Sequence, residues 1–355
     1  MNPLEIIQKF SDEVVSNELQ SINNLAITAN FSLRKTLLLH TRYKQAMTNI
    51  AELHQHNKFN RNGGGLLITG DSGVGKTTIL KQYLDFFPRV HATHKTTIPV
   101  LHVVTPASPT VKSMAEAILL ALGDPMARRG SAEEKTFRIY QLLKMCEVEL
   151  LLIDEFQHFY YAHSVIEFRR ISDWLKNLIS VSGIAVVLFG LPESETVVYS
   201  NEQLARRFSS KQRLTAFRLN NEKDFVEFRA VLKGFQQKLP FSVEESLFEA
   251  NLARRFLVAS NGLLDYLRKI LEGAVVIAGQ TRLQQIDLEI YAAAFRRTIW
   301  PEVPDKLNPF HPQSPVRLLI RPGEPFYSGN KRNALGSPIA RRHVGKSPAD
   351  GGHDE

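Results

Sequence analysis

The segment from Gly70 to Thr77, GDSGVGKT, constrains the fold of this chain more than any other segment. It matches the Walker A pattern G-x-x-x-x-G-K-[ST] of P-loop nucleotide-binding sites. The apolar run Leu66–Thr69 before it predicts a buried strand, and Thr77–Phe87 after it has a helical pattern. In such a strand–loop–helix unit, glycines let backbone N–H groups curl around phosphates, and the helix adds its positive N-terminus. The alternative is a glycine-rich turn that binds no ligand. This alternative is disfavoured because a lysine and a threonine occupy the two positions that the pattern requires.

The individual positions of this segment predict how ATP and Mg²⁺ are bound. Lys76 is expected to supply a positive charge to the β- and γ-phosphates, and Thr77 to offer its hydroxyl to Mg²⁺. The predicted nucleotide-binding residues of this loop are Gly70, Asp71, Ser72, Gly73, Val74, Gly75, Lys76, Thr77 and Thr78.

A second motif, ELLLIDEFQ from Glu149 to Gln157, predicts the other half of the site. Its apolar run Leu150–Ile153 indicates a strand that is covered on both faces. Asp154 follows at the carboxyl end, where open α/β sheets bind ligands, and has the Walker B role of holding Mg²⁺. Glu155 is expected to orient and deprotonate an attacking water. A polar strand end without chemistry is the alternative, and it is disfavoured behind a matching Walker A loop. The sequence therefore predicts a Mg²⁺-dependent ATPase.

Composition narrows the class of protein. The chain has 355 residues, enough for one large or two modest domains, and 43% of them are hydrophobic. The single cysteine, Cys146, excludes a disulfide framework and fits a reducing cytosol. There is no 18-residue apolar run and no signal-peptide pattern, so no membrane span is expected. The net charge of +8 favours a polyanionic partner, although residues 317–355 carry part of this excess.

Predicted strands alternate with predicted helices in the first two thirds of the chain, which implies a parallel sheet of βαβ units. The strands are 99–104, 149–156, 184–189 and 214–219, and the helices are 110–122, 133–145 and 165–180. A complete strand lies between Lys76 and Asp154 along the sequence. This spacing is typical of the AAA+ and RecA-like branch of P-loop proteins rather than of the GTPases.

The changing pattern along the chain predicts four regions. We expect a helical extension over residues 1–60, an α/β nucleotide-binding core over 61–220 and a helical lid over 221–300. The lid helices are predicted at 222–238, 246–259, 263–278 and 284–297. Residues 301–355 form a tail rich in proline, glycine and basic residues that is expected to be largely flexible. The predicted fold class is a P-loop AAA+ ATPase core with a C-terminal helical lid.

With both motifs placed, the chain resembles the TnsC/TniB family of AAA+ transposition regulators, relatives of MuB. The resemblance covers about residues 40–280 and rests on the strings GDSGVGKTTIL, PVLHVVTPASPT, AILLALGDP, LLIDEFQHF and VVLFGLPES. It implies ATP-driven assembly of a ring or helical filament on duplex DNA, through sequence-nonspecific backbone contacts. It also implies a link between a target selector (TnsD or TniQ type) and a DDE transposase (TnsB or TniA type), some of these systems being CRISPR-associated. The expected location is the bacterial cytoplasm, in association with the nucleoid.

The resemblance also suggests residues that act beyond the nucleotide loop. In AAA+ assemblies an arginine of one subunit faces the γ-phosphate of the next, and the candidates here are Arg206 and Arg207, with Arg207 favoured. An exposed basic helix end is the alternative, because the helix dipole favours basic residues there. Arg268 is a candidate for sensor 2, and an ordinary surface arginine is equally expected. At the sensor-1 position Leu191 stands where relatives often have a hydroxyl or amide, which leaves that role unassigned.

Candidate DNA contacts are basic residues near the second strand and the helices after it, since phosphate binding needs Lys and Arg. They are Lys112, Arg128, Arg129 and Lys135, each of which is equally expected on a merely solvated basic face. The tail pairs at 331–332 and 341–342 are further candidates for binding DNA or a partner. We interpret Gln157 as a residue of the assembly interface and His158 as a packing or hydrogen-bonding residue rather than a metal ligand.

Two other functions remain open on the sequence. One is another AAA+ ATPase of DNA metabolism, an initiator or a helicase loader. The other is a STAND-type signalling switch in which hydrolysis acts as a timer and the partner is a protein. The TPASPT and LGDP strings favour the transposition family over a loader.

Overall fold

The computed structural model describes the chain as two compact units. The core unit is formed by residues 45–72 and 76–214, and the helical unit by the described residues among 31–44 together with 73–75 and 215–327. The described residues are 31–33, 36, 40–161, 165–281, 283 and 285–327. The first half of the predicted N-terminal extension and the basic pairs at 331–332 and 341–342 lie outside these ranges.

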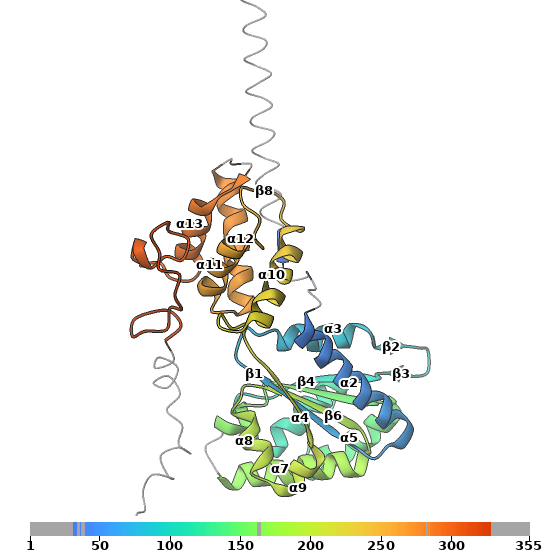
Figure 1. The fold of residues 1–355 in the computed structure, drawn as a ribbon. Helices are drawn as coiled ribbons and strands as arrows, with labels where there is room; N and C mark the ends of the chain where they lie inside the picture. Colours follow the sequence, from blue (N-terminus) through green and yellow to red (C-terminus); the bar gives the residue numbers. More distant parts are fainter. Residues whose placement is uncertain are drawn as a thin grey trace, which may run out of the picture. The chain divides into compact units, whose positions relative to one another are not determined.

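A parallel five-stranded sheet organises the core unit and confirms the predicted sheet (Figure 1). The strands in spatial order are β4 (Val100–Val104), β5 (Leu150–Asp154), β6 (Ala185–Gly190), β1 (Gly65–Gly70) and β7 (Ser210–Leu214). All residues of the three inner strands are buried, which explains their unbroken apolar sequences. β6 separates the two Walker strands in space, whereas the strand that separates them in sequence, β4, lies at the edge.

The last strand of the core differs from its prediction. β7 covers Ser210–Leu214 rather than 214–219, and its sequence SKQRL is mostly exposed because it forms the other edge of the sheet. Leu214 ends β7, and the other apolar residues that suggested a strand at 214–219 belong to the helical unit instead. Phe217 is buried there, and its N–H donates to the Gly262 carbonyl at 3.0 Å.

Helices cover both faces of the sheet (Figure 1). α2 (Thr41–Asn60) and α3 (Lys76–Asp85) lie on one face, and α4 (Val111–Leu122), α5 (Ala132–Met145) and α7 (Val165–Ser182) on the other. α4 and α5 begin at capping boxes on Thr110 and Ser131, and α4 ends at Gly123 with a left-handed φ of 88°. Short elements that no sequence pattern indicated are β2 (Val90–His91), β3 (Thr96–Thr97), α6 (His158–Tyr161) and α8 (Ser194–Tyr199). The short helix α9 (Glu202–Arg207) ends at the basic pair for which a helix end was considered.

The helical unit contains the four predicted lid helices and more. These are α10 (Glu222–Gln236), α11 (Ala250–Ser260), α12 (Leu264–Gln280) and α13 (Leu288–Thr298), with a short parallel pair, β8 (Ser242–Val243) and β9 (Gln285–Ile286). The expected flexible tail needs a correction, because residues 301–327 pack onto these helices around η2 (Asp305–Leu307). Val303, Phe310 and Leu319 are buried in the same apolar core as α11 to α13. Among the described helices none has both the length and the apolarity to cross a membrane.

Candidate nucleotide-binding site

The carboxyl edge of the sheet assembles the predicted site. β1, β6 and β5 run parallel and adjacent, so the loops that follow them emerge at one edge. The Walker A loop follows β1, the Walker B residues end β5, and Leu191 to Glu193 follow β6. Topology alone therefore brings together the groups that the two motifs predicted separately.

The Walker A loop has the backbone conformation that phosphate binding requires. Gly73 and Gly75 have φ values of 85° and 101°, which non-glycine residues rarely adopt. α3 begins at Lys76, and the Lys76 Nζ donates to the carbonyls of Gly70 at 2.7 Å and Asp71 at 2.9 Å. The lysine is thus held over its own loop at a helix N-terminus, the usual place for a phosphate.

Lys76 is surrounded by negative charge. Burial lowers its pKa, and the carboxylates of Glu155, Asp154, Asp71 and Glu193 act in the opposite direction. An ammonium group that lies near carboxylates from both Walker motifs is the electrostatic arrangement expected of a Mg²⁺–nucleotide site.

Asp154 is almost completely buried, with 6% of its surface exposed. Burial raises its pKa, and a hydrogen bond from the Glu155 N–H at 2.8 Å to Oδ1 opposes this shift. Its backbone carbonyl accepts from the N–H of Thr105 at 3.0 Å and from the Thr105 hydroxyl at 2.8 Å. The end of β4 therefore fixes the end of β5, which gives the Thr105-Pro106 step a structural role.

Glu155 adopts an unusual backbone conformation. Its φ of 57° lies in the left-handed region, a costly state for a residue with a side chain and one that often occurs at functional sites. A turn follows, in which the His158 N–H donates to the Glu155 carbonyl at 3.0 Å. The His158 Nδ1 lies 3.0 Å from the Thr105 carbonyl, in agreement with a hydrogen-bonding role.

Two site residues were missed or misread from the sequence. Gln157, interpreted as an interface residue, is only 5% exposed, and its amide contacts the Glu155 carboxylate and the Leu191 N–H. Glu193 was not selected at all, although it contributes to the pKa of Lys76. The Glu193 Oε2 is buried and has no hydrogen-bond partner among the described residues. Its position just after β6, at the carboxyl edge of the sheet, was the available signal.

The donor set fits a nucleoside triphosphate with Mg²⁺. The loop offers the Lys76 ammonium group, Thr77 is an exposed residue with a hydroxyl, and the Asp154 carboxylate lies at the same edge of the sheet. A Cβ at Gly75 would meet no atom within 4 Å, so there is space for a side chain at this position. Glycine is favoured at residue 75 because of its left-handed φ and not because of crowding. Thr78 is exposed beside Thr77 at the start of α3.

The two arginine-finger candidates have different surroundings. Arg207 donates to the carbonyls of Asn62 at 3.0 Å and Gly63 at 3.3 Å, and to the Ser180 hydroxyl at 3.1 Å. The Arg206 side chain is 74% exposed, and among the residues that the structure describes it pairs only with Glu202, one helical turn earlier. Because residues 62 and 63 precede β1, both arginines lie at the amino edge of the sheet, away from the Walker residues of the same chain.

Arg268 lies on α12 within the helical unit, with 13% of its side chain exposed. Its guanidinium forms ion pairs with Asp265 and Glu272 on the same helix. Its sensor-2 role stays a prediction.

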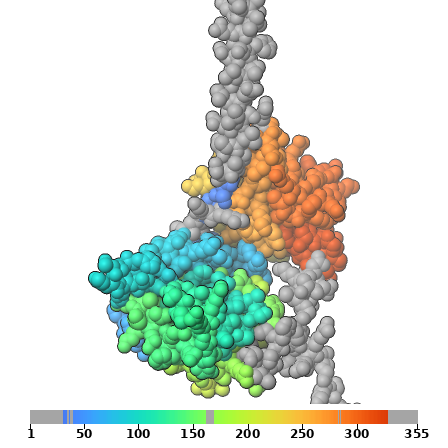
Figure 2. Space-filling view, turned by 180° about the vertical axis from the view of Figure 1, so that it is seen from behind, coloured from blue at the N-terminus to red at the C-terminus, as the bar shows by residue number. Residues whose placement is uncertain are grey.

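The four DNA-contact candidates are not equivalent. Lys112, Arg128 and Arg129 are exposed, and the segment with α4 and α5 forms an open surface of the core (teal to green in Figure 2). Lys112 lies in the first turn of α4 and the two arginines follow its last turn, so about 18 Å of helix separates them. Lys135 needs a correction, because it is completely buried and its ammonium group pairs with the Ala127 carbonyl and Glu116. A lysine held in this way stabilises the loop after α4 and has no surface to offer a phosphate.

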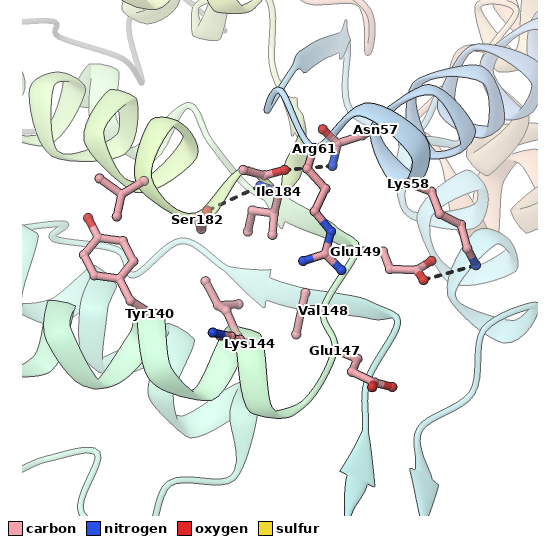
Figure 3. A pocket seen from close by; sticks show the side chains of 13 residues that line it. Asn57, Lys58, Arg61, Tyr140, Lys144, Glu147, Val148, Glu149, Ser182 and Ile184 are labelled. Atoms are coloured by element: carbon pink, nitrogen blue, oxygen red, sulfur yellow. Dashed lines mark hydrogen bonds and ion pairs between the residues drawn. The ribbon is translucent and has the colours of Figure 1, made fainter.

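A separate cavity of about 280 Å³ lies at the amino edge of the sheet (Figure 3). The ends of α2, α5 and α7 and the start of β5 line it, and its basic residues are Lys58, Arg61 and Lys144. Helix C-termini carry partial negative charge, so basic residues beside three of them have a structural reason to be there. Lys58 is also paired with Glu149 at 3.1 Å. The cavity is distinct from the nucleotide site.

The sheet order, the Walker constellation and the helical unit define an AAA+ ATPase fold. A family model described as bacterial TniB protein matches residues 29–218, more than half of the chain. The chain therefore belongs to the TniB family, as the sequence resemblance predicted. No curated protein sequence matches the chain significantly.

Solved structures with a similar fold include ORC and Cdc6 proteins. The ORC2 protein of Aeropyrum pernix, in ADPNP–ADP complexes, has 16% identity and a TM-score of 0.56, covering 78% of this chain and 71% of that chain. The ORC1 protein of the same organism, in complex with DNA, has the same identity and TM-score, with coverages of 77% and 69%. Cdc6p of Pyrobaculum aerophilum has 14% identity and a TM-score of 0.56, with coverages of 77% and 71%. At these identities the similarity concerns the fold. Family and fold together support an AAA+ ATPase of DNA transposition or DNA metabolism.

Proposed function

We propose that this protein hydrolyses ATP to control its assembly on duplex DNA during transposition. The observation that carries the proposal is the juxtaposition of Lys76 with Asp154 and Glu155 at one edge of the sheet, in a chain of the TniB family. In this proposal the assembly connects a target selector of the TniQ or TnsD type to a transposase of the TnsB or TniA type. The protein then acts in the bacterial cytoplasm, at the nucleoid.

The nucleotide chemistry follows from the site. Lys76 faces the β- and γ-phosphates, while Thr77 and Asp154 hold Mg²⁺, which neutralises phosphate charge when bound. Glu155 orients a water molecule and takes its proton. Arg268 keeps its proposed sensor-2 role. ADPNP and ADP in the similar ORC2 structure support a nucleotide in this fold.

The direct test of the proposal is electron microscopy of the protein with duplex DNA and a slowly hydrolysed ATP analogue. Regular rings or filaments on DNA are expected with the analogue and not with ADP. A helicase loader is the alternative within this fold. Addition of the cognate transposase and target selector distinguishes the two, because only a transposition regulator changes target choice in a transposition assay.

Arg206 is our preferred residue for action in trans. Arg207 is already held by three hydrogen bonds to its own subunit, whereas Arg206 is exposed and forms one surface ion pair within the described part of the chain. Surface pairs of this kind contribute little and exchange readily. A free guanidinium stabilises the γ-phosphate of a neighbouring subunit only while that phosphate is present, which couples nucleotide state to assembly.

We expect Arg206→Ala to leave ATP binding by the monomer nearly intact and to lower DNA-stimulated turnover by about tenfold or more. Titration with ATP in the absence of DNA measures the binding, steady-state hydrolysis on DNA measures the turnover, and light scattering follows assembly on DNA. Mixing this variant with Lys76→Ala protein restores part of the activity, since each supplies the half-site that the other lacks. Normal assembly and turnover of Arg206→Ala alone would assign the trans role to other residues, and Glu202→Ala is the control for the lost surface pair.

DNA binding is expected to require ATP, to show little sequence preference and to depend steeply on salt. Each neutralised phosphate of a duplex contributes about −0.9 to the slope of log affinity against log salt. Lys112→Ala and the double variant Arg128→Ala, Arg129→Ala should each make the slope shallower. Lys144→Ala, at an exposed lysine outside this set, is the control. Titrations on two unrelated duplexes measure this, and a flat salt response or tight binding to only one duplex contradicts it.

A further inference from the structure

The side chain of Gln157 lies between the ends of β5 and β6. Its Nε2 donates to the Glu155 Oε2, and its Oε1 accepts from the Leu191 N–H at 3.1 Å. A carboxylate can only accept and an N–H can only donate, so these two contacts are satisfied by one orientation of the amide. Gln157 thus connects the proposed catalytic base to the first residue after β6.

The surroundings leave this amide little freedom. Gln157 is 5% exposed, and its backbone carbonyl accepts from the Tyr160 N–H at 2.9 Å at the start of α6. A Cβ at Gly190 would lie 2.1 Å from the Ser194 Oγ and 3.0 Å from the Gln157 Oε1, closer than side chains normally approach. The absence of a side chain at residue 190 therefore makes room for the Ser194 hydroxyl first and for the Gln157 amide as well.

The position of Gln157 also bears on the missing sensor-1 residue. β6 ends at Gly190, and Leu191 offers an apolar side chain where an AAA+ protein often has a hydroxyl or an amide. The Gln157 amide reaches this strand end from the neighbouring strand and contacts the backbone of Leu191. A polar group is thus present between Glu155 and the end of β6, although it comes from a different part of the chain.

We propose that Gln157 is the positioning residue of Glu155 and supplies the amide that the chain lacks at residue 191. This inference rests on the proposed ATPase function. The left-handed backbone of Glu155 directs its carboxylate toward the Gln157 amide, and the amide holds that carboxylate in one rotamer. The amide is in turn hydrogen-bonded to the end of β6, which lies between the two Walker strands. The Glu155 carboxylate is therefore held at a constant position relative to β6, the strand next to β1 and its Walker A loop.

Two substitutions separate the contacts of the amide. Gln157→Glu keeps an acceptor for the Leu191 N–H and places a second carboxylate against Glu155. Gln157→Met keeps the approximate shape and removes both hydrogen bonds. For each variant we expect kcat for ATP to fall about tenfold or more while KM changes by no more than about twofold, because a misplaced base affects the chemical step and not nucleotide binding. Gln141→Met, at an exposed glutamine on α5, should retain wild-type kinetics.

A double-mutant cycle distinguishes positioning from general structural support. If Gln157 acts through Glu155, the variant that combines Glu155→Gln with Gln157→Met has the same kcat as Glu155→Gln alone. Additive losses, or single Gln157 variants with turnover within about twofold of wild type, would overturn the proposal. If Gln157→Met does not fold, the closer mimic Gln157→Glu and its combination with Glu155→Gln provide the same cycle. A wild-type protein without ATP hydrolysis would instead refute the proposed function.

Discussion

Lys76→Ala protein is expected to lose ATP binding and, with it, assembly on DNA. The ammonium group is partly buried among carboxylates, and in the proposed function it is the cation that binds the β- and γ-phosphates. Removing one partner of a buried charged pair costs about 2–5 kcal/mol, which lowers affinity by roughly 30-fold to several thousand-fold. Isothermal titration with ATP and Mg²⁺ measures the loss.

The control for this variant is Lys81→Ala, at an exposed lysine further along the same helix. It removes an equal charge from α3 but none from the loop, so its ATP affinity should stay close to that of the wild type. Undiminished ATP binding by Lys76→Ala would contradict the Walker A assignment.

Glu155→Gln is expected to separate binding from hydrolysis. An amide cannot take a proton from water, and a positioned general base contributes about 100- to 10,000-fold to a rate. Turnover should fall by a factor in that range while ATP affinity is retained, and assemblies on DNA should persist longer. Single-turnover hydrolysis and the dissociation rate from DNA after dilution measure the two effects.

Glu52→Gln, at an exposed glutamate on α2, makes the same chemical change away from the site. It should hydrolyse ATP like the wild type. If Glu155→Gln turnover remains within a few-fold of wild type, another residue acts as the base, and Glu193 is the next carboxylate at that edge.

The sequence predicted the structural elements that are determined by interactions between residues close together in the chain. Both Walker motifs, the inner strands and the helices α4, α5 and α7 follow from apolar runs, glycine positions and capping residues, such as the Thr110 and Ser131 caps. Most helices of the helical unit were also predicted from their periodicity. In each case the residues that determine the element lie within it.

The differences arise where distant parts of the chain decide the structure. β7 was misplaced because an edge strand needs no apolar run, and residues 301–327 are ordered by burial of three apolar side chains against the lid helices. Lys135 is indistinguishable from a surface lysine in the sequence, but it is buried, and its ammonium group pairs with the Ala127 carbonyl and Glu116. The proposed positioning role of Gln157 depends on its hydrogen bond with the Leu191 N–H, 34 residues away in the sequence. No local sequence pattern predicts such a contact.

The opposite locations of Arg206 and the Walker residues have a consequence for the whole assembly. β1 has six residues and is therefore about 20 Å long. The Walker A loop follows its carboxyl end, and the Gly63 carbonyl, which accepts a hydrogen bond from Arg207, lies just before its amino end. Subunits joined through these two edges must form a head-to-tail interface. Such an interface generates either a closed ring or an open filament, and both are polar. In an open series, one terminal subunit binds ATP without a neighbouring arginine, and the other presents Arg206 to solvent. In the proposed assembly the two ends differ chemically, and we propose that the target selector binds one end and the transposase the other.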